Sequence, residues 1–390
     1  VIHNTQIHGT AQRLSYNSDS GLMTMDNGAF SRCEPMDPFW MVQASRLMLD
    51  NANGVGYASE LTLRLRDVPV FYYPYTLQFP IGDQRVSGIL PPSISNSRDN
   101  GLDIAVPYYL NLAPHYDATL TPRLMTERGV MLNAEFRYLA DWSMNTVTAA
   151  LLPDDKTFDA TRASLSSNAT PQSRRWFAGF SHEGQPWQNW RTFVDFNAVS
   201  DANYFRDLGT RNLDLESRTH LNKEAVVSWQ DVSWHAEARV QSIQLLDPYL
   251  ASIDVNKPFD RLPEVKLSRQ GDSIGPLRYG IDASHVRFDR SLERSLLTAQ
   301  QINNGALVTG TRISAEPWMT LPIRGAGYFF IPGARYRYAS WQLDQQAANT
   351  ADNPERGVSV FSLDSGLIFD RPVTVAGLSA TQTLEPRLYY

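Results

Sequence analysis

The chain has 390 residues, of which 19% are charged and 11% are aromatic, and its mean hydropathy of -0.34 is polar. Its formal charge of -6 comes without a basic stripe, so nucleic acid is not expected as a partner. No stretch approaches the roughly eighteen apolar residues of a transmembrane helix. The strands of an outer-membrane barrel alternate and score weakly on hydropathy, so a membrane location stays open.

The first 85 residues predict short strands separated by polar turns. Apolar side chains recur with a period of two, which indicates strands that are covered on one face. The apolar stripe consists of Trp40, Val42, Leu61, Leu63, Leu65, Val70 and Tyr72. We interpret it as the interior of a β jelly-roll or sandwich.

The segment Pro69 to Pro80, in which this stripe ends, contains three prolines. Proline lacks the amide donor of a sheet ladder, so uninterrupted pairing is not expected there. We place a domain boundary directly after it, which divides the chain into residues 1–85 and 86–390.

From about residue 88 the alternating runs become longer, as at 116–124, 130–138 and 232–241. Each run has about nine or ten residues, the length that a tilted strand needs to cross hydrocarbon. Further predicted strands are 188–197, 275–289, 305–318, 324–341, 357–369 and 373–390. The spacers 154–173 and 342–357 are rich in Asp, Asn and Ser.

This pattern predicts a large antiparallel transmembrane β-barrel with short turns at one end and long polar loops at the other. The alternative is a large soluble β-protein. Charges on the alternating inward face would then lie in a dry core, which is energetically costly.

Motifs of catalysis are missing from the sequence. It contains no HExxH, Walker loop, GxGxxG or paired CxxC, and its seven histidines form no ligand-spaced cluster. The segment Gly179–Gly184 resembles a nucleophile elbow but has Glu183 where GxSxG requires glycine. Ser181 and His182 are adjacent on a predicted strand and would point to opposite faces. We therefore expect no enzyme, no cofactor, no metal and no catalytic residue.

Several short sequence motifs occur in the same order along the chain as in the LptD family of lipopolysaccharide-assembly proteins, also called organic-solvent-tolerance proteins, and are similar to the motifs of that family. They are Ser31–Pro35 with Trp40–Val42, Val68–Tyr75, Phe79–Pro80, Ser87–Pro92, Val106–Pro114, Tyr116–Arg123, Glu135–Leu139 and Gln382–Arg387. The dense part of the resemblance spans residues 31 to 140.

The resemblance implies a periplasmic β jelly-roll that receives lipopolysaccharide from a related bridge protein of the LptA type. A barrel of roughly twenty-six strands would follow in the outer membrane, with a lipoprotein plug of the LptE type. This chain would hold the end of the jelly-roll and about half of the barrel. The apolar stripe would then be the groove for acyl chains, although periodicity alone does not separate a groove from an ordinary core.

Three residues acquire roles from the resemblance. Pro92 and Pro107 match prolines on neighbouring strands that weaken pairing at a lateral gate, through which lipopolysaccharide would reach the outer-membrane lipids. The alternative is that both mark strand starts or bulges. Cys33 matches a cysteine that forms a disulfide with a partner outside this chain, and its alternative is a small buried thiol.

Two other functions compete with lipopolysaccharide transport. A general porin or uptake channel shares the alternating strands but needs no amphipathic jelly-roll. An outer-membrane enzyme such as a lipid-A acyl hydrolase needs a catalytic site that the sequence does not supply.

Overall fold

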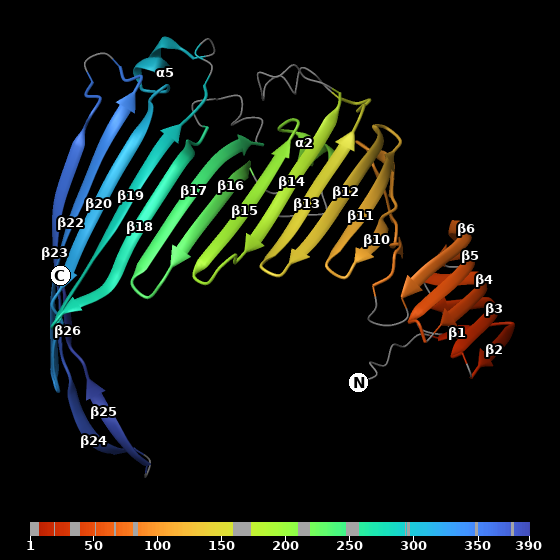
Figure 1. The fold of residues 1–390 in the computed structure, drawn as a ribbon, viewed down its shortest axis with the longest axis horizontal. Helices are drawn as coiled ribbons and strands as arrows, with labels where there is room; N and C mark the ends of the chain where they lie inside the picture. The colour runs from red at the N-terminus through yellow and green to blue at the C-terminus, as the bar shows by residue number, and fades with distance from the viewer. Residues whose placement is uncertain are drawn as a thin grey trace. The chain divides into compact units, whose positions relative to one another are not determined.

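The predicted all-β, antiparallel architecture is confirmed in a computed structural model (Figure 1). The structure describes residues 8–18, 20–31, 40–50, 52–65, 68–80, 85–158, 173–209, 219–246, 257–292, 294, 297–347, 350–375 and 378–390. Within these residues the helices are two five-residue turns, α2 (Tyr204–Leu208) and α5 (Ala299–Asn303). None of the described helices is long and apolar enough to span a membrane.

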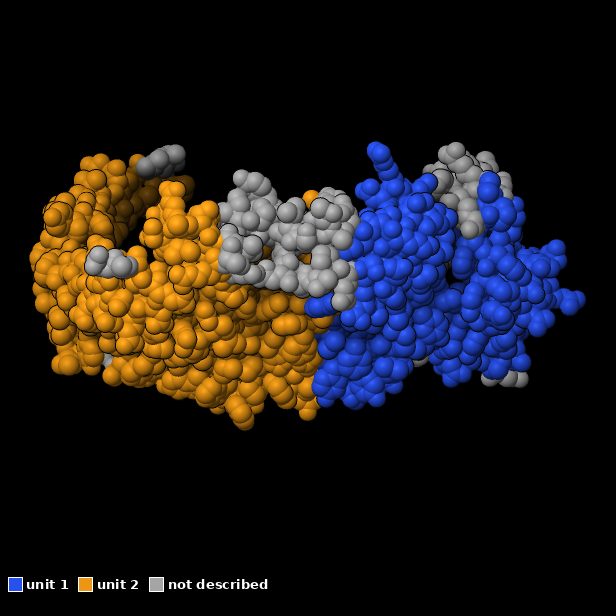
Figure 2. All heavy atoms as spheres, turned by 90° about the horizontal axis from the view of Figure 1, so that it is seen from above, with its two compact units in different colours: residues 1–139, 146–158, 173–176 blue, residues 140–145, 159–172, 177–390 orange. Residues whose placement is uncertain are grey.

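Contacts along the chain divide it into two compact units, which Figure 2 shows in different colours. Unit 1 comprises residues 1–139, 146–158 and 173–176, and unit 2 comprises 140–145, 159–172 and 177–390. Residue 85 lies between two sheets, because β6 ends at Pro80 and β7 begins at Gly88. As a boundary between domains, residue 85 stays a prediction.

The first sheet of unit 1 has six antiparallel strands. They are β1 (His8–Thr10), β2 (Arg13–Asn17), β3 (Leu22–Ser31), β4 (Trp40–Asp50), β5 (Val55–Leu65) and β6 (Val68–Pro80), in the order β1-β3-β4-β5-β6 with β2 also on β3. Its small apolar core is made of Ala44, Leu47 and Ala58, with Leu61 packed against it. A jelly-roll built on this sheet stays a prediction.

The second sheet begins in unit 1 with short strands and continues with long ones. They are β7 (Gly88–Ile89), β8 (Ser93–Ser97), β9 (Gly101–Ala105), β10 (Tyr108–Ala113), β11 (Tyr116–Met125), β12 (Gly129–Ala140) and β13 (Ser143–Leu152). The short strand β7 pairs with β10, and β8 pairs with β9. The longer β11 pairs with β9, β10 and β12.

In unit 2 the strands run side by side in antiparallel pairs, and both β20 and the short β21 pair with β22 (Figure 1). They are β14 (Arg175–Gly184, which starts in unit 1), β15 (Trp190–Val199), β16 (His220–Gln230), β17 (Trp234–Leu245), β18 (Asp260–Ile274), β19 (Leu277–Asp289), β20 (Thr309–Thr320), β21 (Ile323–Gly325), β22 (Tyr328–Asp344) and β23 (Glu355–Leu367). The predicted strands 188–197 and 275–289 correspond to β15 and β19. The predicted run 324–341 begins in β21 and continues through most of β22, and 357–369 covers most of β23 but ends on the first residue of β24. The predicted run 305–318 starts before β20, in a turn.

The last three strands form one interrupted hairpin with β23. They are β24 (Phe369–Val375), β25 (Leu378–Leu384) and β26 (Arg387–Tyr389). The pair Gly366 and Arg387 and the pair Phe369 and Leu384 lie in the same register, so the two ladders continue each other. The run 373–390, predicted as one strand, is therefore wrong. It contains the end of β24, then β25 and β26.

Alternation places apolar side chains on the exposed face of the second sheet. In β11 and β12, Leu120, Leu132 and Phe136 are exposed, while Asp117 and Thr121 are buried on the other face. A sheet in water would do the reverse. The exposed face therefore requires an apolar environment.

Candidate functional site

The two predicted gate prolines lie at breaks in two neighbouring strand paths of unit 1. The segment Leu90–Pro92 separates β7 from β8, and Val106–Pro107 separates β9 from β10. Next to the breaks, Leu90 N donates to Pro107 O at 2.8 Å and Val106 N donates to Pro122 O at 3.1 Å. At the two breaks, isolated backbone hydrogen bonds therefore replace the continuous ladder of the sheet.

The breaks face each other across the sheet. Below them Ile89 pairs with Tyr108, and above them Ser93 pairs with Ala105. Pro107 is fully buried and Pro92 is half-buried, and each directly precedes the first residue of a strand. The structure therefore brings both prolines to one place, the seam. Their role in opening stays a prediction.

Below the breaks, Asp117 on β11 accepts four hydrogen bonds from three side chains. Arg137 on β12 donates through Nε at 2.8 Å and Nη2 at 2.9 Å, Tyr109 on β10 donates its hydroxyl at 3.0 Å, and Arg85 donates Nη1 at 2.8 Å. The Asp117 side chain is 4% exposed. This foot cluster of Asp117, Arg85, Arg137 and Tyr109 links the segment before β7 to three strands.

Above the breaks, a second buried carboxylate joins three turns of unit 1. Asp155 accepts from Arg128 Nη1 at 2.8 Å and from Arg175 Nη1 at 3.0 Å, and Arg128 Nε also donates to Asn100 at 2.8 Å. Burial by itself would raise the pKa of Asp155, but the hydrogen bond from Arg175 and the charge of Arg128 hold that pKa below its usual value. Asn100 belongs to the β8–β9 turn, so this head cluster fixes the other end of the seam.

In unit 2, charged side chains form ladders on the polar face of the strands. Arg239 on β17 lies 3.2 Å from both Glu224 and Glu237, and Lys266 on β18 lies 3.4 Å from Glu237. The pairs of Arg239 with Glu224 and of Lys266 with Glu237 join neighbouring strands, and together with the pair of Arg239 and Glu237 within β17 they satisfy these charges within the sheet. They make this face a hydrophilic lining, as the alternation predicts.

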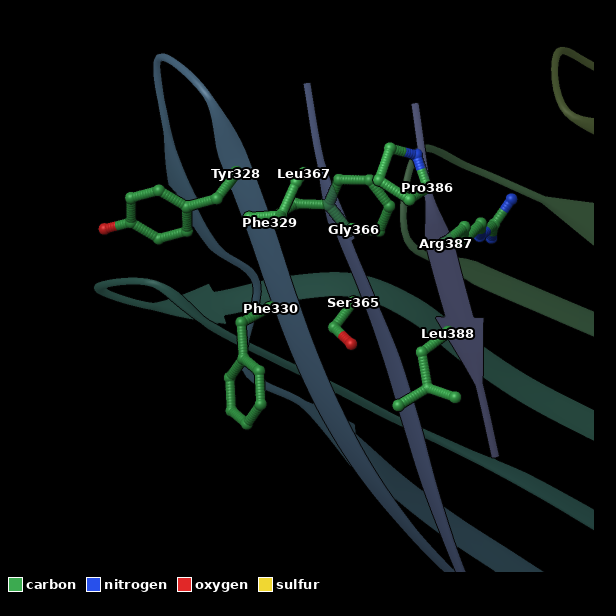
Figure 3. A pocket seen from close by; sticks show the side chains of 9 residues that line it. All are labelled: Tyr328, Phe329, Phe330, Ser365, Gly366, Leu367, Pro386, Arg387 and Leu388. Carbon is green, nitrogen blue, oxygen red and sulfur yellow. The ribbon is translucent and has the colours of Figure 1, made fainter. Parts of the chain in front are cut away.

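A hollow of about 420 Å³ lies where β22, β23 and β26 meet (Figure 3). Arg387 donates two hydrogen bonds of 2.7 Å to Asp364, and its guanidinium lies 5.9 Å from the centre of the Phe329 ring. Phe329 lies over Gly366, where a Cβ would be 2.5 Å from the ring. Arg387, the last residue of the motif Gln382–Arg387, therefore links β26 to Asp364 on β23.

The predicted acyl-chain groove is only partly assembled on one face. Val42 pairs with Leu63, so these two side chains share a face with Leu61. Tyr72 pairs with Thr62 and therefore points to the opposite face, where it is 58% exposed. The expectation that Tyr72 shares the stripe is wrong because the register shifts by one residue between Leu63 and Arg64, so that Tyr72 pairs with Thr62 and not with Leu61.

The structure leaves other predicted residues without side-chain description. Trp40 and Leu65 are paired through their backbones, and Val70 lies in β6 between the paired residues Pro69 and Phe71, where the register shifts. Cys33 lies outside the described residues.

Ser181 and His182 lie in β14 with successive, opposite orientations, as predicted. His182 Nδ1 is 2.7 Å from Asn145 Oδ1 and its Nε2 is 2.8 Å from Thr192 Oγ1, so both ring nitrogens have partners other than Ser181. Among the described residues no group of three or more histidines, cysteines or carboxylates is placed to hold a metal ion.

Sequence reasoning missed the foot and head clusters. Alternation placed Asp117 on the polar face but gave no partner for it. Arg85 and Asp155 lie outside any alternating run, and their partners are 32 and 20 residues away along the chain. Only the strand register and the course of the loops reveal these clusters.

Comparison with protein-family models matches residues 173–390 to a family described as "LPS transport system D" and residues 57–240 to one described as "LptD protein". LPS-assembly proteins LptD of Pseudomonas putida GB-1 and Hahella chejuensis are each 33% identical over all of this chain. That of Pseudomonas aeruginosa UCBPP-PA14 is 34% identical. The chain covers 44%, 47% and 43% of these proteins, which is less than half of their length.

A solved structure also matches this chain. The crystal structure of Pseudomonas aeruginosa OccK5 (OpdH) aligns over 97% of this chain and 95% of its own, with 11% identity and a TM-score of 0.25. At this score the likeness carries no argument.

Proposed function

Because this chain belongs to the LptD family, we propose that it is part of an outer-membrane translocon that moves lipopolysaccharide to the cell surface. The observation that carries the proposal is the combination of an exposed apolar face and a charged face in one sheet with an interrupted seam. Lipopolysaccharide is itself amphipathic. A conduit for it must offer an apolar route for acyl chains and a polar route for sugars.

The polar route is the charged face of the long strands. Ladders such as Glu224–Arg239–Glu237 line it with paired charges. In the outer membrane the exposed apolar face would contact the lipid chains. The chain would work without a cofactor and without catalytic chemistry.

The apolar route begins on the first sheet, in the periplasm. Val42, Leu61 and Leu63 are half-buried on one face, beside the core of Ala44 and Ala58. A face covered only in part can accept an acyl chain with little rearrangement. A bridge protein of the LptA type would deliver lipopolysaccharide to this groove.

The exit is the seam at Pro92 and Pro107. Proline supplies no amide donor, and between the β7–β10 pair and the β8–β9 pair isolated hydrogen bonds replace the ladder, so this part of the sheet separates at lower cost than the long ladder of β11 and β12. We propose that lipopolysaccharide leaves sideways at this gate. A lipoprotein plug of the LptE type and the remainder of the polypeptide would complete the barrel.

Depletion of the full-length protein in cells tests the proposal. We expect surface lipopolysaccharide to fall while uptake of small solutes stays normal. Loss of solute uptake with normal surface lipopolysaccharide would instead indicate a general porin. Release of a hydrolysis product by the pure protein would indicate an enzyme.

A further inference from the structure

One carboxylate holds the segment through which the first sheet of unit 1 connects to the second. Arg85 donates Nη1 to Asp117 at 2.8 Å and Nη2 to the carbonyl oxygens of Ala113, at 3.3 Å, and Pro114. Ala113 is the last residue of β10, and Pro114 lies in the turn between β10 and β11. Arg85 therefore forms hydrogen bonds with both β10 and β11, and β10 forms one side of the seam.

The backbone of the same segment is fixed by Asn111 on β10. Asn111 N donates to Ser87 Oγ at 2.8 Å, and Asn111 Nδ2 donates to Arg85 O at 2.6 Å. Directly after Ser87 comes β7, which pairs with β10 over two residues only. Residues 85–87 are thus fixed by hydrogen bonds to β10 and β11 directly before the seam begins at β7.

The short strand β7 is too short to stay paired by its ladder alone. Hydrogen bonds to ionised groups are roughly twice as strong as neutral ones, and Asp117 supplies such bonds in a nearly buried position. At the far end, the bond from Arg128 to Asn100 fixes the β8–β9 turn. The seam is held at both ends and weak between them.

We infer that Asp117 is a positioning residue of the gate, because its carboxylate anchors residues 85–87 through Arg85 and keeps the foot of the seam closed. When the strands separate at Pro92 and Pro107, residues 85–87 stay in place and β7 stays paired with β10. The connection to the first sheet keeps its place beside the seam during opening. This inference rests on the proposed lateral gate.

Hydrogen exchange of the full-length protein in detergent tests the anchor. In the variants Asp117→Asn and Arg85→Gln we expect amides of residues 87–90 to exchange about tenfold faster, the effect of losing one charged hydrogen bond. The matched control is Glu316→Gln, which removes ion pairs of Glu316 with Arg335 and Arg337 in unit 2. It should leave residues 87–90 unchanged.

Surface lipopolysaccharide in cells that carry the same variants gives the second readout. We expect a several-fold loss for Asp117→Asn and Arg85→Gln, and partial recovery for Arg85→Lys, which keeps the charge but loses the planar fork. The Arg85 side chain is 44% exposed, so Arg85→Gln can be tested even where Asp117→Asn fails to fold.

Unchanged exchange at residues 87–90 in Arg85→Gln would overturn the inference, and so would faster exchange with normal surface lipopolysaccharide. A failure of the proposed function looks different. Depletion of the unaltered protein would then leave surface lipopolysaccharide normal, whatever the exchange rates of the variants.

Discussion

The guanidinium of Arg175 donates a hydrogen bond of 3.0 Å to the carboxylate of Asp155, and the two side chains are 1% and 0% exposed. Arg128 shares the same carboxylate oxygen. Asp155 therefore balances positive charge that water does not reach. The long β13–β14 connection and the β11–β12 turn are held together at this point.

Replacing Asp155 should destabilise unit 1. Asp155→Asn keeps the shape but leaves Arg128 and Arg175 buried without this negative charge, which costs about 3–5 kcal/mol. The control is Asp26→Asn, because Asp26 pairs with Arg46 at 3.4 Å on an exposed surface and its loss should cost less than about 1 kcal/mol. Guanidinium unfolding of the purified protein measures both, and equal effects would contradict the prediction.

The same carboxylate predicts an acid-sensitive contribution to stability. The folded-state pKa of Asp155 lies below its ordinary value of 3.8, so its stabilising contribution is complete above that value and is lost as the pH falls through the folded pKa. The difference in unfolding free energy between the unaltered protein and Asp155→Asn should be constant near neutral pH and shrink below pH 3.8. A difference that grows on acidification would show the opposite sign of the shift.

Alternating strands were predictable because a period of two is a local property of the sequence. The runs 116–124 and 130–138 lie within β11 and β12, whereas Val232 lies before β17 begins. The face of Tyr72 was not predictable, because register shifts after Ser59 and Leu63 are set by pairing with β6. The same holds for the bond from Arg85 to Asp117, which depends on where the chain turns.

Restoring regular pairing at the gate should slow lipopolysaccharide delivery. The double variant Pro92→Ala, Pro107→Ala provides two amide donors, and each hydrogen bond gained would stabilise the closed seam by about 1 kcal/mol. Surface lipopolysaccharide should fall several-fold. Pro332→Ala serves as the control, because Pro332 lies within β22 of unit 2, where it pairs with Leu363. Normal delivery by the double variant would remove the prolines from the mechanism.

The exposed face of β17 should tolerate no charge if it contacts lipid. Val240 is 45% exposed and lies near the middle of the strand, so Val240→Arg should cost about 2–4 kcal/mol in a bilayer. Gln241→Arg is the matched control on the other face, opposite Glu224, and should cost little. Folding into lipid vesicles at increasing denaturant compares the two, and equal destabilisation would argue against a lipid-facing side.

Photo-crosslinking in cells from Leu63, with Tyr72 as the control, tests lipopolysaccharide transport through this chain most directly. The two residues lie on opposite faces of the first sheet, because Tyr72 pairs with Thr62 and Leu63 pairs with Phe71. We predict that a photoreactive residue at position 63 forms an adduct with lipopolysaccharide during active transport and that one at position 72 does not. No adduct from position 63, or equal adducts from both, would contradict the account.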